Sequence, residues 1–366
     1  MKKPRIHISY SDGHFYPKKE YPEKEWFSCS QIAKHIWECL SKRFDGVTYG
    51  DTVPDEEIDV LWTNRLNTWH PSVKQMVYFA SVEHYEFVTR AVKKATSSIG
   101  VTAIEGVYSL NERWNYWLTL ARSSHILAIG NDAVRKSFNC QLLTCPLDVI
   151  DCGVDIDRFS PGPVTMKEDI FVHNATRFQA RKGSHIVADA WKLVSKELPS
   201  AKLLILGRPG DVDMSAMLQG SERVIIVGKY EAGSKEYIDK LKTAKWVVLQ
   251  SCAEGQAGTV LEAMACGCVP IATADTGIDA DVYGGYVTEP ISSVLLSEQM
   301  IKAAKEWTPQ IADSVIEKVK ERHSWHTFEN KVMDITEQLL EQSRPRLKSQ
   351  SLILSGFLIQ LVKGLR

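Results

Sequence analysis

The sequence predicts an α/β protein with two domains, each a parallel, doubly wound sheet covered by helices. Short β-rich runs alternate with amphipathic helical stretches in both halves of the chain, and this alternation is typical of parallel sheets with crossover helices. The 366 residues are long for one domain and natural for two of about 150 to 180 residues each. A segment rich in turn residues and proline, at 152–163, lies between the two patterns, as a linker would.

Composition excludes several classes of protein. With 44% hydrophobic residues, 24% charged residues and a formal net charge of −1, the chain has no basic stripe for nucleic acid, and no nucleic-acid partner is expected. No signal peptide precedes Arg5, and no run of about 18 apolar residues could span a bilayer. We therefore expect a cytoplasmic protein with reduced thiols. Cys266 and Cys268 have pairing spacing but no second pair nearby, so zinc is not expected.

The first half reads as strands joined by helices. Strands are expected near 5–10, 47–49, 58–62, 75–79, 125–129 and 146–150, and helices near 32–40 and 113–121. Ligands of such sheets lie at the carboxyl ends of the strands, here the loops after residues 10, 62 and 79. His84, in the third loop, either binds or orients an acceptor hydroxyl or is an ordinary hydrogen-bonded surface histidine. Gly13 alone is not a glycine-rich fingerprint, so no dinucleotide site is predicted.

The second half repeats the pattern, with strands near 169–174, 201–206, 223–227 and 245–250 and helices near 185–198 and 235–243. Arg177 and Lys182 lie just past its first strand, five residues apart. A guanidinium fork and a flexible ammonium there can clamp a diphosphate. The alternative is a solvated basic turn. Asp211 and Asp213 resemble a metal-binding pair, but they follow a Pro-Gly turn without further ligands, which favours an exposed loop.

The most informative stretch is 251–272, where the strand ending at residue 250 enters a glycine-punctuated turn and a short apolar helix closed by Gly267. Gly255 and Gly258 let backbone amides approach a ligand closely, and the first turn of the helix carries partial positive charge. Glu254 and Glu262 flank the point where an anion would lie. The alternative is the strand-to-helix turn of any α/β protein.

Four ordered segments resemble the retaining glycosyltransferases of the GT-B fold, the large family four. These are 151–161, Arg177-x4-Lys182-Gly, 203–207, and Glu254-x7-Glu262 with the Ala-Met-Ala-Cys-Gly-Cys-Val-Pro that follows. The resemblance covers residues 124–335 well and the first 120 only by topology. It implies two Rossmann-like domains with parallel sheets facing across a cleft: an acceptor-side domain at 1–157, a linker at 158–168, a nucleotide-sugar domain at 169–323, a helix crossing back at 324–343, and an amphipathic tail at 344–366.

The resemblance also assigns roles to the charged residues. It implies that Arg177 and Lys182 hold the diphosphate of the donor and neutralise the charge of the departing nucleotide. Glu254 would bind hydroxyls of the transferred sugar, and Glu262 would bind the ribose hydroxyls. Such enzymes commonly need no metal, because fixed cations and a helix end supply the same electrostatics; no metal or other cofactor is therefore expected.

Further positions complete the expected site. The amides around Gly255, Gly258 and Thr259 would meet the distal phosphate, and Tyr230, after the strand that ends at Gly228, is a candidate for contacting the base. His84 would serve the acceptor. The chain departs from the family at Glu254-Gly-Gln-Ala-Gly258, because the family more often has Phe-Gly at the second and third positions after the first Glu. We expect donor choice to depend on this departure. The loop after the first strand also lacks the glycine pair that many members carry.

The implied reaction is transfer of a hexose from a UDP- or GDP-sugar to a hydroxyl of a sugar, glycan or lipid-linked acceptor, with retention of the anomer. We expect this reaction to serve surface-glycan or glycolipid synthesis. Two alternatives stay open: a transferase acting on a small sugar-phosphate acceptor, and an inactive module that binds nucleotide sugar or glycan. The tail at 348–366 has an apolar stripe edged by cations. It either contacts the inner face of the membrane peripherally or packs on its own domain or a partner.

Overall fold

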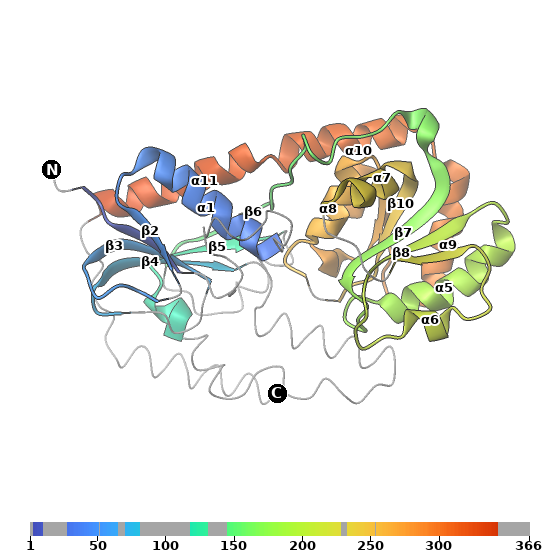
Figure 1. The fold of residues 1–366 in the computed structure, drawn as a ribbon, viewed down its shortest axis with the longest axis horizontal. Coiled ribbons are helices and arrows are strands. Elements are labelled where there is room, and N and C mark those ends of the chain that lie inside the picture. The colour runs from blue at the N-terminus through green and yellow to red at the C-terminus, as the bar shows by residue number, and fades with distance from the viewer. Residues whose placement is uncertain are drawn as a thin grey trace. The chain divides into compact units, whose positions relative to one another are not determined.

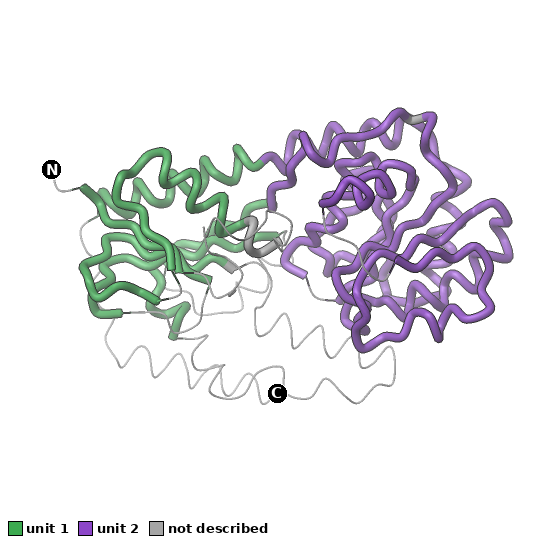
Figure 2. Tube along the Cα trace, in the orientation of Figure 1, with its two compact units in different colours: residues 1–87, 106–151, 325–366 green, residues 88–105, 152–324 purple. Residues whose placement is uncertain are grey.

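The computed structural model describes residues 3–9, 28–50, 52–64, 70–80, 118–130, 145–227, 233–252 and 254–342. These residues form two compact units (Figure 2). Unit 1 comprises the described residues up to 151 together with those from 325 onward, and unit 2 comprises those from 152 to 324. Within the described ranges, no helix combines the length and the apolar character needed to cross a bilayer.

Unit 1 is a six-stranded sheet in which every strand runs parallel to its neighbours, in the order β2-β1-β3-β4-β5-β6. Its strands are β1 (Ile6–Ser9), β2 (Val47–Gly50), β3 (Ile58–Thr63), β4 (Val73–Ala80), β5 (His125–Ile129) and β6 (Leu147–Ile150). Helix α1 (Ser28–Arg43) packs on β1 and β2. The strands expected in the first half of the sequence are therefore present, and they form a single parallel sheet.

Helix α11 (Trp325–Glu341) also belongs to unit 1 and packs on α1 and β3. Its apolar face is fully buried, and polar contacts fix its position. The Trp325 ring stacks on His35 with centroids 3.8 Å apart, and the Glu329 carboxylate lies 2.8 Å from Nδ1 of His35. The indole N–H of Trp62 donates to the Thr336 hydroxyl at 3.1 Å. The chain thus returns to unit 1 after it has completed unit 2.

Unit 2 holds a second parallel six-stranded sheet, in the order β12-β11-β10-β7-β8-β9; Figure 1 labels β7, β8 and β10 of this sheet. Its strands are β7 (Glu168–Arg177), β8 (Lys202–Arg208), β9 (Val224–Val227), β10 (Ala244–Leu249), β11 (Val269–Ala272) and β12 (Tyr286–Val287). Its helices are α5 (Ser184–Glu197), α6 (Met214–Met217), α7 (Lys235–Thr243), α8 (Gly258–Ala265), α9 (Ser293–Glu306) and α10 (Pro309–Arg322). The chain proceeds outward from β7 to β9, then returns to the centre and proceeds the other way from β10 to β12, so the strand order reverses between β7 and β10.

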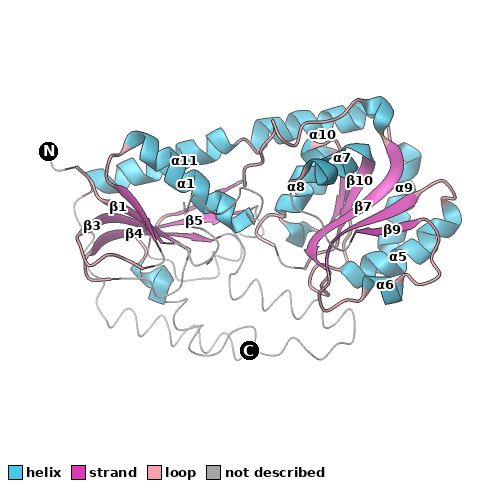
Figure 3. Ribbon diagram, in the orientation of Figure 1, coloured by secondary structure: helices cyan, strands magenta, loops and turns pink. Residues whose placement is uncertain are grey.

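The two faces of this sheet are covered by different helices: α5, α6 and α9 lie on one side, and α7, α8 and α10 lie on the other (Figure 3). Aromatic side chains fill the centre beneath α5. Phe171 of β7 and Trp246 of β10 are register partners, and their rings stack with centroids 4.3 Å apart. Trp191 of α5 meets Phe171 edge-on. These three side chains are buried. Contacts between aromatic rings stabilise a core by more than the burial of their apolar area alone.

One boundary differs from the sequence expectation in a way that matters for function. Strand β7 continues to Arg177, whereas the apolar run predicts an end near residue 174. The register with β8 shifts between Asn174 and Arg177, so pairing resumes after an irregularity. The Ala-Thr-Arg at this bulge does not continue the apolar run, and for this reason the sequence does not reveal the last three residues of the strand.

Candidate functional site

The point where strand order reverses in a doubly wound sheet is the usual place for a ligand, because adjacent loops diverge there. In unit 2 these loops follow β7 and β10, and they touch each other. The amide of Cys252 donates to the Arg181 carbonyl at 3.0 Å. Gly183 has φ of 65°, and a Cβ added to it would lie 2.3 Å from the carbonyl oxygen of Gln250. Only glycine fits this approach.

A buried histidine fixes the first of these loops. Nδ1 of His173 lies 3.0 Å from the Val248 carbonyl oxygen, and Nε2 lies 3.0 Å from the Ser184 hydroxyl. Because a carbonyl only accepts, Nδ1 carries the proton and the Ser184 hydroxyl donates to Nε2. Burial lowers the pKa of His173 to about 4, and the charge of Lys182 acts in the same direction. The ring is therefore neutral and holds the start of α5 against β10.

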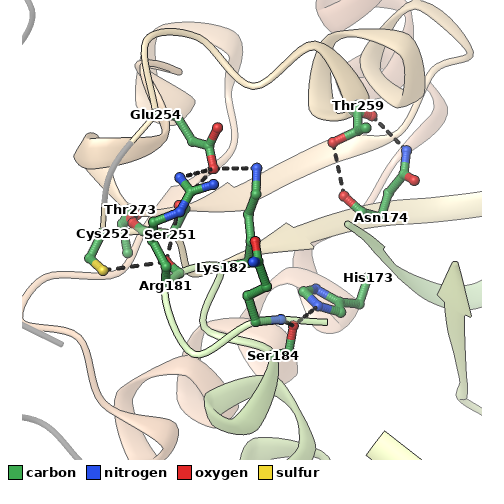
Figure 4. Close-up of polar contacts among 11 residues, drawn as sticks. His173, Asn174, Arg181, Lys182, Ser184, Ser251, Cys252, Glu254, Thr259 and Thr273 are labelled. Carbon is green, nitrogen blue, oxygen red and sulfur yellow. Dashed lines mark hydrogen bonds and ion pairs between the residues drawn. The ribbon is translucent and has the colours of Figure 1, made fainter. Parts of the chain in front are cut away.

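Two cations from the first loop meet one carboxylate from the second (Figure 4). The ammonium of Lys182 is paired with Oε1 of Glu254, and Nη1 of Arg181 lies 3.3 Å from the same oxygen. The Ser251 hydroxyl donates to this oxygen as well, at 2.9 Å. The side chains of Lys182 and Glu254 are only 13% and 7% exposed. Together the three charged groups carry one net positive charge at the switch point.

The pKa of Glu254 shows which effect prevails in this cluster. Burial would raise it, but the charges of Lys182 and Arg181 and the hydrogen bonds from Lys182 and Ser251 outweigh burial and hold the pKa below its ordinary value. Glu254 is therefore ionised at neutral pH, and its carboxylate holds Arg181 and Lys182 between the loops that follow β7 and β10.

The sequence analysis singled out Arg177 and Lys182, and the structure places them differently. Lys182 lies in the ion-pair cluster, whereas Arg177 is exposed at the end of β7 and pairs in register with Arg208 of β8. Arg181 was missed as a site residue. Spacing alone cannot identify it, since it is one of several basic residues in one turn; only the fold shows that its guanidinium faces Glu254.

The turn after Glu254 is held by backbone hydrogen bonds. The amides of Glu254 and Ala257 each donate at 2.9 Å, to the carbonyls of Asp275 and Thr276 respectively.

The side chain of Gln256 supports the same turn. Its Oε1 accepts from the Cys152 amide at 2.5 Å, and its Nε2 donates to the Gly277 carbonyl at 3.2 Å. We expected donor choice to depend on this departure from the family pattern. These two contacts with backbone groups show that the side-chain amide holds the turn, and the dependence of donor choice on this departure stays a prediction.

Helix α8 begins at Gly258, and its first turn is tied to β7. The Thr259 hydroxyl donates to the Asn174 carbonyl at 2.9 Å, and Nδ2 of Asn174 donates to the Thr259 carbonyl at 2.8 Å. The N-cap residue of the helix is Ala257, whose side chain has no hydrogen-bond acceptor, so no side-chain cap bonds to the amides at the start of the helix. The amides of Gly258 and Thr259 lie at the first two positions of the helix and have no partner within it, so they can receive an anion. The Val260 amide already donates to the Ala257 carbonyl at 2.9 Å, and the Thr259 hydroxyl donates to β7.

Glu262 lies one turn further along α8. Its Oε2 accepts from the Tyr237 hydroxyl at 2.5 Å. Burial raises its pKa to about 7, against the opposing effects of the Tyr237 hydrogen bond and the charge of Arg158. The two carboxylates of the motif therefore differ: Glu254 is held ionised by cations, whereas Glu262 titrates near neutral pH.

His84, Tyr230 and the tail at 348–366 lie outside the described residues. Asp211 and Asp213 are exposed, as expected for an exposed loop. Asp211 accepts from the Ala180 amide at 3.0 Å, and Asp213 caps α6 by accepting from the Ala216 amide at 3.0 Å. In the part of the chain that the structure describes, no group of three or more His, Cys, Asp or Glu side chains could hold a metal ion. Cys266 and Cys268 are buried free thiols.

Residues 170–306 match the family described as "Glycosyl transferases group 1", and this range contains the whole ion-pair cluster and α8. No curated protein matches significantly. A sucrose-phosphate synthase from Thermosynechococcus elongatus is similar over 93% of this chain and 100% of its own, with 15% identity and a TM-score of 0.65. The fold is GT-B.

Other GT-B structures agree. Anabaena HepE, solved in complex with UDP-glucose, is similar over 91% of this chain and 99% of its own, with 17% identity and a TM-score of 0.65. The pneumococcal O-GlcNAc transferase GtfA, in complex with UDP and GlcNAc, is similar over 85% of this chain and 61% of its own, with 13% identity and a TM-score of 0.58. At these identities the likeness establishes the fold.

Proposed function

We propose that this GT-B protein is a retaining glycosyltransferase of family four that moves a hexose from a nucleoside-diphosphate sugar to a hydroxyl acceptor. The observation that carries the proposal is the buried cluster of Lys182, Arg181 and Glu254 at the switch point of unit 2, on loops that flank the start of α8. A cluster with surplus positive charge beside uncapped helix amides suits a ligand with a diphosphate and a polar group next to it.

The cations serve the leaving group in this proposal. Breaking the bond between sugar and phosphate leaves an oxocarbenium-like sugar and a nucleoside diphosphate anion, and fixed positive groups at the anion can stabilise that separation by several kcal/mol. Lys182 and Arg177 hold the diphosphate, with Arg181 as an additional cation. The amides around Gly255, Gly258 and Thr259 receive the distal phosphate. No metal is required for these interactions.

The two carboxylates take separate parts. Glu254, kept ionised by its cations, accepts hydrogen bonds from hydroxyls of the transferred sugar. Before a donor arrives, its pairing with Lys182 keeps the ammonium extended toward the site, so that binding exchanges one anionic partner for another. Glu262 accepts from the ribose hydroxyls through its free oxygen. Tyr230 remains our candidate for the base, and His84 for the acceptor.

The comparisons favour particular substrates. HepE was solved with UDP-glucose, and GtfA with UDP and GlcNAc, so UDP-sugars are the first donors to test, followed by GDP-sugars. We propose a sugar, glycan or lipid-linked acceptor, a role in surface-glycan or glycolipid synthesis, and a cytoplasmic location with peripheral membrane contact through residues 348–366.

Retention would follow from attack by the acceptor hydroxyl on the face that the phosphate leaves, with the leaving phosphate as base. Once a donor and an acceptor are known, NMR of the product anomer decides this part of the proposal. An inverted linkage would refute retention without touching the donor site.

Donor binding is the first experiment. Calorimetric titration with UDP-glucose, UDP-GlcNAc and GDP-mannose is expected to find at least one ligand, and Lys182→Ala is expected to weaken its binding by about tenfold or more, given the usual strength of a charge-assisted contact. Lys202→Ala is the matched control, since Lys202 forms an exposed ion pair with Glu168 on β8 and β7. If Lys182→Ala and Lys202→Ala bind equally well, the proposed donor site is wrong.

A further inference from the structure

The hydrogen bond between Tyr237 and Glu262 joins a buried side chain to a partly exposed one. Tyr237 is on α7 and is 1% exposed, whereas Glu262 on α8 retains intermediate exposure. The phenol oxygen lies 2.5 Å from Oε2 of Glu262. A side chain so completely covered cannot contact a ligand itself, so any effect it has on a ligand passes through Glu262.

The direction of this hydrogen bond is fixed by its neighbours. Nδ2 of Asn174 lies 2.8 Å from the Thr259 carbonyl oxygen and 2.8 Å from the Tyr237 oxygen. Since a carbonyl only accepts, the Asn174 amide nitrogen faces it, and this nitrogen must also donate to the phenol oxygen. The phenol proton is then directed at Glu262, which accepts. The chain of donors runs from β7 through α7 to α8.

Packing holds the phenol ring in place as well. Phe159 meets the Tyr237 ring edge-on, with centroids 6.2 Å apart and planes at 89°, and the Ser234 hydroxyl caps α7 by accepting from the Tyr237 amide at 3.2 Å. Both the ring and the start of its helix are therefore fixed without the carboxylate. Tyr237 forms a rigid donor against which Glu262 can be oriented.

We propose that Tyr237 is a positioning residue for donor binding: it holds Oε2 of Glu262 so that the other carboxylate oxygen faces the ribose of the donor nucleotide. The assignment rests on the proposed function, in which Glu262 accepts from the ribose. Only an ionised carboxylate offers acceptors on both oxygens, so the hydrogen bond from Tyr237 supports the binding form of Glu262.

Two groups oppose the effect of burial on Glu262 among the described residues. Tyr237 from α7 and Arg158 from the segment before β7 both favour its ionised form against burial. The thiol of Cys266, at the C-cap of α8, lies nearby but is uncharged, because burial raises its pKa. Removing the Tyr237 hydroxyl takes away one of the two opposing effects, so the pKa of Glu262 should rise further. As the pH is lowered, the nucleotide affinity of the variant should then begin to fall at a higher pH than that of the wild type.

The test measures nucleotide affinity against pH. Calorimetric titration of UDP and GDP into the full chain is repeated from about pH 6 to about pH 9 for wild type, Tyr237→Phe and Tyr286→Phe. Tyr286→Phe is the matched control, because it removes a hydroxyl that donates to an exposed carboxylate, that of Glu306, at 2.9 Å. Circular dichroism and melting temperature confirm that each variant is folded.

For Tyr237→Phe we expect the Kd for the nucleotide at about pH 7 to rise about threefold or more over the wild-type value. At about pH 9 the two Kd values should agree within about twofold. The pH below which affinity is lost should therefore be higher in the variant than in the wild type. The control should follow the wild type throughout. A pH profile of Tyr237→Phe that superimposes on the wild type, or a loss of affinity equal at every pH, overturns the assignment.

Glu262→Gln separates this inference from the proposed function. If Glu262→Gln weakens UDP or GDP binding while Tyr237→Phe retains the wild-type profile, the ribose role of Glu262 survives and the role of Tyr237 is refuted. If Glu262→Gln binds both nucleotides as well as the wild type, or if the wild type binds neither, the proposed function fails at this residue and the Tyr237 assignment fails with it.

Discussion

The ion pair between Lys182 and Glu254 allows a quantitative test of the site, because both partners are nearly buried. Removing one partner of a buried ion pair typically lowers the free energy of unfolding by about 3–5 kcal/mol, since the other charge is left uncompensated. In Lys182→Met, Arg181 and Ser251 still face the carboxylate, so we expect the lower end, about 3 kcal/mol. Glu254→Gln leaves the ammonium without its carboxylate and should cost about as much.

The double variant of Lys182→Met and Glu254→Gln removes both charges. We expect it to be less destabilised than the sum of the single variants by about 2 kcal/mol, within the usual range for residues in contact. Thermal unfolding followed by tryptophan fluorescence measures this, since about 3 kcal/mol lowers the melting temperature of a unit of this size by about 6 to 12 °C. Additive losses would show that the two residues do not interact in solution and would refute the described cluster.

Three further predictions concern the surroundings of this pair. Glu262→Gln should raise the free energy of unfolding at about pH 8 by about 2 to 3 kcal/mol, because the pKa of this carboxyl rises on folding from 4.5 to about 7. The wild type loses stability as the pH rises between these two pKa values, whereas the variant does not. Chemical denaturation should therefore show no stability gain from Glu262→Gln at about pH 4. Gly183→Ala should cost at least about 2 kcal/mol by the same assay, since it combines φ of 65° with a contact of 2.3 Å to a backbone oxygen; an unchanged midpoint would contradict the geometry of the loop. Gln256→Glu should lower the free energy of unfolding by about 1 to 3 kcal/mol, because it sets an oxygen against the Gly277 carbonyl while the Cys152 amide keeps its acceptor. Gln256→Ala leaves both the Gly277 carbonyl and the Cys152 amide without their side-chain partner, so it should be no more stable than Gln256→Glu.

Much of the fold follows from local patterns in the sequence. The alternation of apolar strands and amphipathic helices predicts parallel sheets, and the resemblance predicts GT-B; both are confirmed by the two six-stranded sheets and by the similar structures. The end of β7 was not predictable, because the bulge before Arg177 interrupts the period of the strand. Short helix α6 was also missed, since four residues carry too little periodicity to be recognised.

The site was predictable only where residue type and spacing carry the information. Glu254, Glu262 and Lys182 stand out by motif. Arg181 and Tyr237 do not, because their roles depend on which loops and helices the fold brings together across 73 and 25 residues of sequence. Gln256 shows the opposite case: the sequence marks it as unusual, but only the structure shows that its side chain supports the turn by contacts with two backbone groups.

The central claim is that the cluster after β7 and β10 binds and activates a nucleotide sugar. The most direct test is the release of nucleoside diphosphate from UDP- and GDP-sugars in the absence of acceptor, compared among wild type, Lys182→Ala, Glu254→Ala and the exposed control Lys202→Ala. We predict a slow release by the wild type and the control that falls by about tenfold or more in the two site variants. Release that is equal in all four proteins, or a wild type that binds donors but releases none even when candidate acceptors are added, would contradict the account; the second result would favour an inactive module that binds nucleotide sugar.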